Sequence, residues 1–171
     1  MAFPLVDTYL QAADVAAGFI DSPPPIPLLE HYARSAWVKA PLDAPANVRA
    51  RESGEAEAAE GSVALAKRLR AVIAELHGQL ANEPPDRPVF LPWAGRSLTL
   101  GDYLTSRLLE IVIHVDDLAV SVEATPPALP EGATDATLTL LTRLAARRHG
   151  VAPVLRALSR SERASGSIAA I

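Results

Sequence analysis

The sequence contains no cysteine. Disulfide bonds, thiolate metal ligands and a cysteine nucleophile are therefore excluded for this chain, and any metal that it binds must take nitrogen and oxygen ligands. Two sequence motifs that mark catalytic or phosphate-binding loops are also missing. There is no G-x-S-x-G elbow of the kind that serine hydrolases use, and there is no glycine-rich phosphate loop. Histidine and carboxylate side chains are left as the main candidates for chemistry.

An excess of positive charge and a long apolar run are also lacking. The formal net charge is -4, whereas nucleic acid and anionic membranes are normally bound through a basic patch. No stretch of about 18 uncharged apolar residues occurs, and the N-terminal residues lack a positively charged signal region. We therefore expect no nucleic-acid partner, no membrane partner and a cytoplasmic location.

The residues that are present fit one helical-bundle domain spanning residues 1–171, because 49% of them are hydrophobic and the length is that of a single compact domain. Apolar residues recur at helical spacing in several segments, while two short extended pieces around Gly95 predict a minor β-hairpin near 88–99. The fold class that we expect is all-α, a four-helix-type bundle. The predicted helices cover residues 4–20, 28–37, 45–82, 99–123, 135–149 and 152–163.

The helix predicted to start at the N-cap Thr99 carries a polar stripe in an otherwise apolar segment. A helix advances roughly 100° per residue, so the four stripe residues fall within about 80° of one another. They are Arg107, Glu110, His114 and Asp117. Nearly all other positions are apolar, which predicts a buried helix, and buried charges must be paired or bind a ligand.

Two interpretations of the stripe remain open from spacing alone. In the first, it is a structural network in which Glu110 accepts hydrogen bonds from Arg107 and His114, and Asp117 bonds the far imidazole nitrogen. In the second, Glu110 and His114 are metal ligands, Asp117 orients His114 and Arg107 anchors an anion. A catalytic zinc usually has three protein ligands, so a third would have to come from a facing helix.

The other histidines have simpler expected roles. His77 and His149 each precede a glycine near a predicted helix end, where an imidazole interacts favourably with the helix dipole. His31 follows Glu30 in a proline-flanked segment, and we expect it on the surface.

Residues 95–104, Gly-Arg-Ser-Leu-Thr-Leu-Gly-Asp-Tyr-Leu, lead into Arg107-xx-Glu110-xxx-His114-xx-Asp117-Leu118. This pattern resembles the metal-binding domain of mycothiol-dependent maleylpyruvate isomerases, within the DinB-like bundle superfamily. The resemblance extends over residues 85–150 and is looser in the helices on either side. It implies a four-helix bundle that holds a divalent metal, typically zinc, and Glu110 and His114 match two of the family's ligands. It also implies mycothiol as cofactor, a small thiol or keto acid as partner, and a metal- and thiol-dependent isomerase or transferase activity.

The sequence departs from the family pattern at one point. The family's first metal histidine lies in a motif of the form Gly-Trp-(Ser/Thr)-Val-xx-(Val/Leu)-xx-His-Leu, which this sequence does not contain. Residues 6–10 align with the segment after that motif, so we expect the ligand to lie upstream of Met1, in an N-terminally truncated bundle with an incomplete site. Such a bundle is expected to form a homodimer that covers exposed apolar surface. The alternative function is a non-catalytic bundle that acts as a binding or interaction module.

Overall fold

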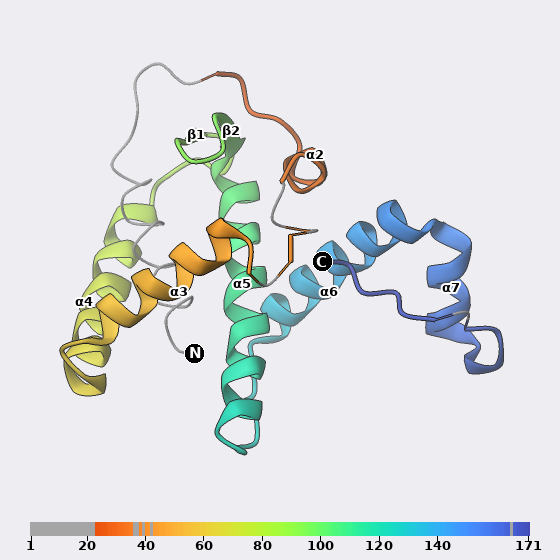
Figure 1. Ribbon diagram of the computed structural model, residues 1–171. Coiled ribbons are helices and arrows are strands. Elements are labelled where there is room, and N and C mark those ends of the chain that lie inside the picture. Colours follow the sequence, from red (N-terminus) through yellow and green to blue (C-terminus); the bar gives the residue numbers. More distant parts are fainter. Residues whose placement is uncertain (1–22, 36–37, 39, 42, 165) are drawn as a thin grey trace.

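The computed structural model describes residues 23–171 except 36–37, 39, 42 and 165 (Figure 1). In this part of the chain the structure is mostly helical with one small sheet, which confirms the predicted all-α class with a minor hairpin. The elements are α2 (Leu28–Ala33), α3 (Pro45–Ala58), α4 (Ser62–Leu80), β1 (Pro88–Leu91), β2 (Arg96–Thr99), α5 (Leu100–Ser121), α6 (Glu131–His149), α7 (Val151–Ser159) and a 3-10 turn (Ser161–Arg163). The helix predicted over residues 4–20 lies outside the described residues.

The helix predicted over residues 45–82 is two helices. The first ends at Ala58 and the second begins at Ser62, with Gly61 between them at a φ of +88°. Glycine adopts this left-handed conformation without the steric penalty that a Cβ atom brings, so the chain changes direction here. Gly54, a residue of low helix propensity, stays inside α3.

The hairpin sets the start of α5. Strands β1 and β2 are antiparallel, with Val89 opposite Leu98. Directly after β2, the Oγ1 atom of Thr99 accepts a hydrogen bond from the backbone N–H of Asp102 at 3.1 Å. The predicted N-cap of α5 is therefore confirmed, and the cap satisfies one of the donors that every helix start leaves unpaired.

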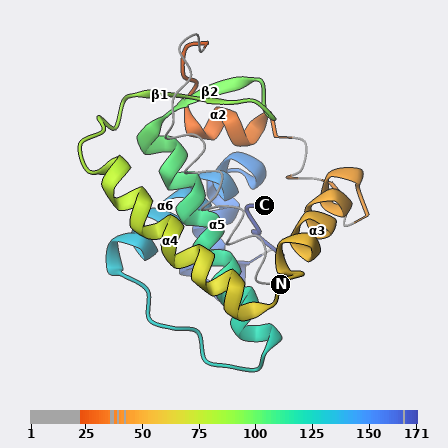
Figure 2. The same ribbon diagram turned by 90° about the vertical axis from the view of Figure 1, so that its left-hand side faces the viewer.

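Helix α5 runs through the middle of the molecule. It packs against α6, which in turn packs against α7, while the short α2 contacts both α5 and α6. Figures 1 and 2 show α4 and α6 on opposite sides of α5, with the hairpin over its N-terminal end. The core lies where α2, the hairpin, α5 and α6 meet, and α4 adds Leu76 to it. Its buried apolar side chains are Leu28, Tyr32, Leu76, Val89, Leu91, Leu98, Leu100, Tyr103, Leu109, Leu140 and Leu144.

The prediction that α5 is buried on nearly every side is wrong for its C-terminal end. Val120 is 70% exposed and Val122 just beyond the helix is 63% exposed. Four of the five buried residues of α5 lie in its first half, and only the small Ala119 is buried near its C-terminal end. The helix then extends past the core (Figure 1). Among the described helices, none combines the length and apolar character that crossing a membrane requires.

Candidate functional site

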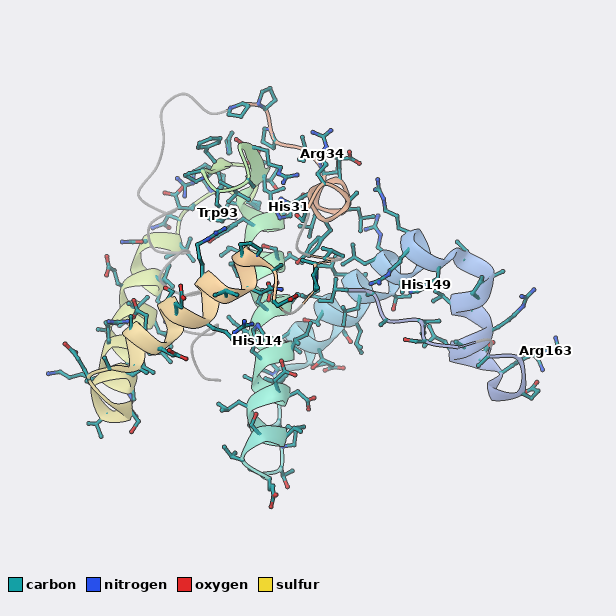
Figure 3. The ribbon with its side chains drawn as sticks, viewed as in Figure 1. His31, Arg34, Trp93, His114, His149 and Arg163 are labelled. Carbon is teal, nitrogen blue, oxygen red and sulfur yellow. The ribbon has the colours of Figure 1, made fainter. Side chains whose placement is uncertain are left out.

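Helix α5 brings three of the four stripe residues into direct contact. The imidazole of His114 lies between two carboxylates, with its Nε2 atom 3.4 Å from Oε2 of Glu110 and its Nδ1 atom 3.1 Å from Oδ2 of Asp117. The contacts follow from the helical repeat, because residues three and four positions apart lie on the same face. Figure 3 places His114 midway along α5.

The three side chains differ in their access to solvent. Glu110 and His114 are partly buried, whereas Asp117 is exposed. The hydrogen bond that His114 donates to the Glu110 carboxylate is the main cause that raises the pKa of His114 above its ordinary value. Burial opposes it, and Asp117 raises the pKa further. In the absence of a metal, the site therefore favours the protonated imidazole.

Arg107 lies one turn before Glu110. Its guanidinium lies over the ring of Tyr103, 5.6 Å from the centroid, and its Nε atom donates a hydrogen bond to the Ser106 hydroxyl at 3.3 Å. Its positive charge also lowers the pKa of His31. Arg107 thus occupies the end of the stripe nearest the hairpin and α2, and its role as an anion anchor stays a prediction.

The expectation that His31 lies on the surface is wrong. The residue is 6% exposed, and its ring packs edge-on against Tyr32 with 5.6 Å between the centroids. Burial, followed by the positive charges of Arg96 and Arg107, lowers the pKa of His31 to about 4, so the imidazole is neutral near pH 7. The Nδ1 atom has no hydrogen-bond partner in the described part of the chain. The signal that sequence reasoning missed is that Leu28, His31 and Tyr32 form one buried face of α2.

Tyr32 connects α2 electrostatically to the stripe. Burial, together with the negative charge of Glu110, raises the pKa of the Tyr32 phenol. The structure therefore adds His31 and Tyr32 to the surroundings of the stripe. The two remaining histidines lie elsewhere: His77 is exposed in the last turn of α4, and His149 ends α6 with its Nε2 atom 2.8 Å from the carbonyl oxygen of Ala169.

The donor atoms fit part of a metal site. Zinc bonds to histidine nitrogen and carboxylate oxygen are about 2.0–2.2 Å long, so two ligands of a tetrahedral site lie about 3.3 Å apart. The 3.4 Å between His114 Nε2 and Glu110 Oε2 matches this spacing. Asp117 contacts the opposite ring nitrogen, as a carboxylate that orients a ligating histidine does. However, the described residues contain no group of three His, Asp or Glu side chains arranged to hold a metal ion.

Comparison with known families shows to which family the chain belongs. The model of the mycothiol maleylpyruvate isomerase N-terminal domain matches residues 10–119. The chain belongs to this family. The maleylpyruvate isomerase match includes the hairpin and nearly all of α5, with the whole polar stripe, while α6 and α7 lie beyond it. No curated protein and no solved structure is similar enough to the chain to be matched.

Proposed function

We propose that Glu110 and His114 hold a divalent cation such as zinc, and that the bundle is a metal- and thiol-dependent isomerase or transferase. The observation that carries this proposal is the pair of donor atoms 3.4 Å apart on one face of α5, with Asp117 on the remaining imidazole nitrogen. The family supports it, because its name couples mycothiol with an isomerase of a keto acid. Two protein ligands leave coordination positions for further ligands.

A divalent metal bound there would supply Lewis acidity, which polarises a carbonyl group or lowers the pKa of a thiol. The chain's own residues would prepare the site. Asp117 would accept a hydrogen bond from Nδ1–H of His114, which fixes the tautomer and leaves Nε2 unprotonated as the metal ligand. Arg107, one turn away, would attract the carboxylate of a keto acid toward the same face. The substrates that we propose are therefore a small thiol, in this family mycothiol, and a small keto acid.

A non-catalytic role is the second candidate, and the same distances favour it. The Glu110–His114–Asp117 contacts satisfy one another without any metal, and the described residues offer two protein ligands rather than three. In that case the stripe stabilises the bundle as a hydrogen-bonded network, and the protein acts as a binding module.

Zinc titration followed by calorimetry distinguishes the two candidates. We expect one zinc ion per chain for the parent protein and loss of binding in both Glu110→Gln and His114→Ala. Asp117→Asn should weaken binding by roughly 10- to 100-fold, because it removes the group that orients the ligand.

Three matched substitutions serve as controls for the zinc titration. His77→Ala and Glu75→Gln change exposed residues of α4, and Asp116→Asn changes an exposed neighbour of Asp117. All three should bind zinc as the parent does, and circular dichroism should show every variant folded. A parent that binds no zinc, or binding that survives His114→Ala, would exclude the metal site and leave the structural network.

A further inference from the structure

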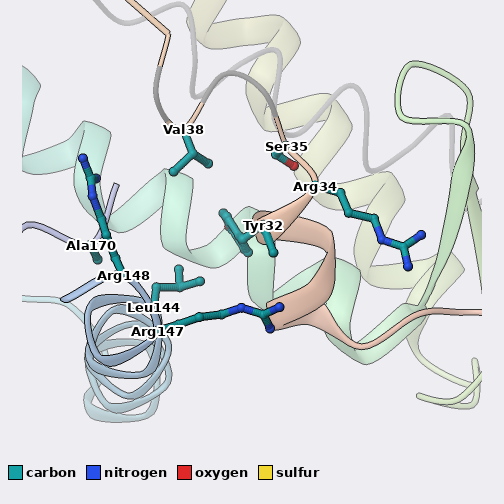
Figure 4. A pocket seen from close by; sticks show the side chains of 9 residues that line it. Tyr32, Arg34, Ser35, Val38, Leu144, Arg147, Arg148 and Ala170 are labelled. Atoms are coloured by element: carbon teal, nitrogen blue, oxygen red, sulfur yellow. The ribbon is translucent and has the colours of Figure 1, made fainter. Parts of the chain in front are cut away.

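A second candidate site lies away from the stripe, between the C-terminal end of α2 and the C-terminal half of α6. The cavity there has a volume of about 400 Å³ (Figure 4). Pockets of roughly 300 to 1,000 Å³ are typical of small-molecule sites. None of Glu110, His114 and Asp117 lines this cavity. A ligand bound there would therefore not contact the proposed metal ligands.

The wall of the cavity is mainly apolar. Tyr32 and Leu144 are buried core residues, and Val38 and Ala170 are partly buried and pack against the same core. These side chains come from α2, α6, the segment after α2 and the C-terminal segment. Their convergence provides a surface for an aromatic ring or a branched hydrocarbon, whose burial is favourable by the hydrophobic effect.

The rim of the cavity carries an excess of positive charge. Arg34 Nε lies 2.9 Å from Oε1 of Glu30, and Arg147 Nη2 lies 2.9 Å from Oε2 of the same carboxylate. One carboxylate therefore serves two guanidinium groups, and both lower the pKa of Glu30. Arg148 lines the cavity as well, and in the described part of the chain its side chain makes no hydrogen bond or ion pair.

Three arginines against one glutamate leave positive charge and many N–H donors beside an apolar wall. Guanidinium groups bind carboxylates through charge-assisted hydrogen bonds, often in pairs. We propose that this pocket binds an organic anion with a single carboxylate and a compact aromatic or branched apolar body. The apolar part would lie against Tyr32 and Leu144, and the carboxylate would be bound by Arg148 with the free donors of Arg147.

The test uses 3-phenylpropionate as the probe and its neutral amide, 3-phenylpropionamide, as the matched control. In a ¹⁵N-edited NMR titration of the full chain, we expect the carboxylate to shift the amide signals of residues 32–35, 144–148 and 170. The amide compound should bind at least about tenfold more weakly, since a hydrogen bond to a charged group is lost. Raising the salt concentration should weaken binding of the carboxylate, because these arginines are exposed.

Two substitutions at the rim should change the affinity for 3-phenylpropionate in opposite directions. Arg148→Gln should weaken binding of 3-phenylpropionate about fivefold or more, by removing one charged donor. Glu30→Gln should strengthen it, because the carboxylate that competes for Arg34 and Arg147 is gone. A gain in affinity cannot result from misfolding, so the Glu30→Gln variant tests the proposal even if Arg148→Gln fails to fold. The control is Arg163→Gln, an exposed arginine far from the pocket (Figure 3), which should leave the affinity unchanged.

Three results would each overturn the proposal. The first is equal affinity for the carboxylate and the amide compound. The second is an unchanged affinity in both Arg148→Gln and Glu30→Gln. The third is the absence of shifts at the pocket residues when the probe reaches millimolar concentration.

Discussion

His31 is a buried, neutral histidine, and this makes the stability of the fold sensitive to mild acid. Its pKa is about 4 in the folded protein, against an ordinary value of 6.5. The unfolded chain therefore binds more protons than the folded one between these values, so stability rises with pH in that window. The contribution of His31 is fully present above pH 6.5 and is lost as the pH falls from 6.5 toward 4.

We expect the parent to lose about 3 kcal/mol more unfolding free energy than His31→Gln when the pH falls from about 7 to about 4. Urea denaturation of both proteins at the two pH values measures this difference. Carboxylates also titrate in this range, and comparison with the variant cancels their effect. An identical loss in parent and variant would show that His31 is protonated as easily in the folded state as in the unfolded state.

At the scale of helices and strands, the start of α5 depends on a single hydroxyl group. The Oγ1 atom of Thr99 caps the helix through the backbone N–H of Asp102. Thr99→Ala should lower the free energy of unfolding by about 1 kcal/mol, whereas Thr99→Ser keeps the acceptor and should lose much less. Thermal or urea denaturation of the three proteins provides the measurement. Equal stability of the alanine and serine variants would contradict a capping role.

Features that depend on a single helix could be predicted from the sequence, whereas features that depend on packing between helices could not. The Glu110–His114–Asp117 contacts and the Thr99 cap depend on residues within one continuous helix, where the helical repeat fixes their spacing. The burial of His31 depends on how α2 packs against α5 and α6. The spacing of Leu28, His31 and Tyr32 places them on one face of a helix, but it does not show that this face meets the rest of the bundle. The break at Gly61 was not predicted, because a glycine inside a helical segment weakens the helix without by itself ending it.

Helix α6 belongs to the same core as the segment that defines the family. The family match ends at residue 119, yet Leu140 and Leu144 from α6 lie in one cluster with Leu109 and Tyr103 from α5. The buried surface of the matched segment is therefore completed by residues beyond it. The single bundle domain and the homodimer expected from the sequence stay predictions.

Two leucines of α6 test this packing. Leu140 is 5% exposed and Leu138 is 57% exposed. Leu140→Ala should cost about 2–5 kcal/mol of unfolding free energy through lost burial and the cavity left behind, whereas Leu138→Ala should cost less than about 0.5 kcal/mol. Urea denaturation measures both values. Equal costs would contradict the orientation of α6.

The contacts along α5 also determine which kinds of genetic change the candidate site tolerates. One residue inserted between Glu110 and His114 would rotate the imidazole by roughly 100° relative to the carboxylate, and a deletion would rotate it the other way. Either change would separate the pair now 3.4 Å apart, although every side chain would be retained. Among natural variants that keep the site, the number of residues from 110 to 117 should therefore be constant, even where the apolar residues between them differ.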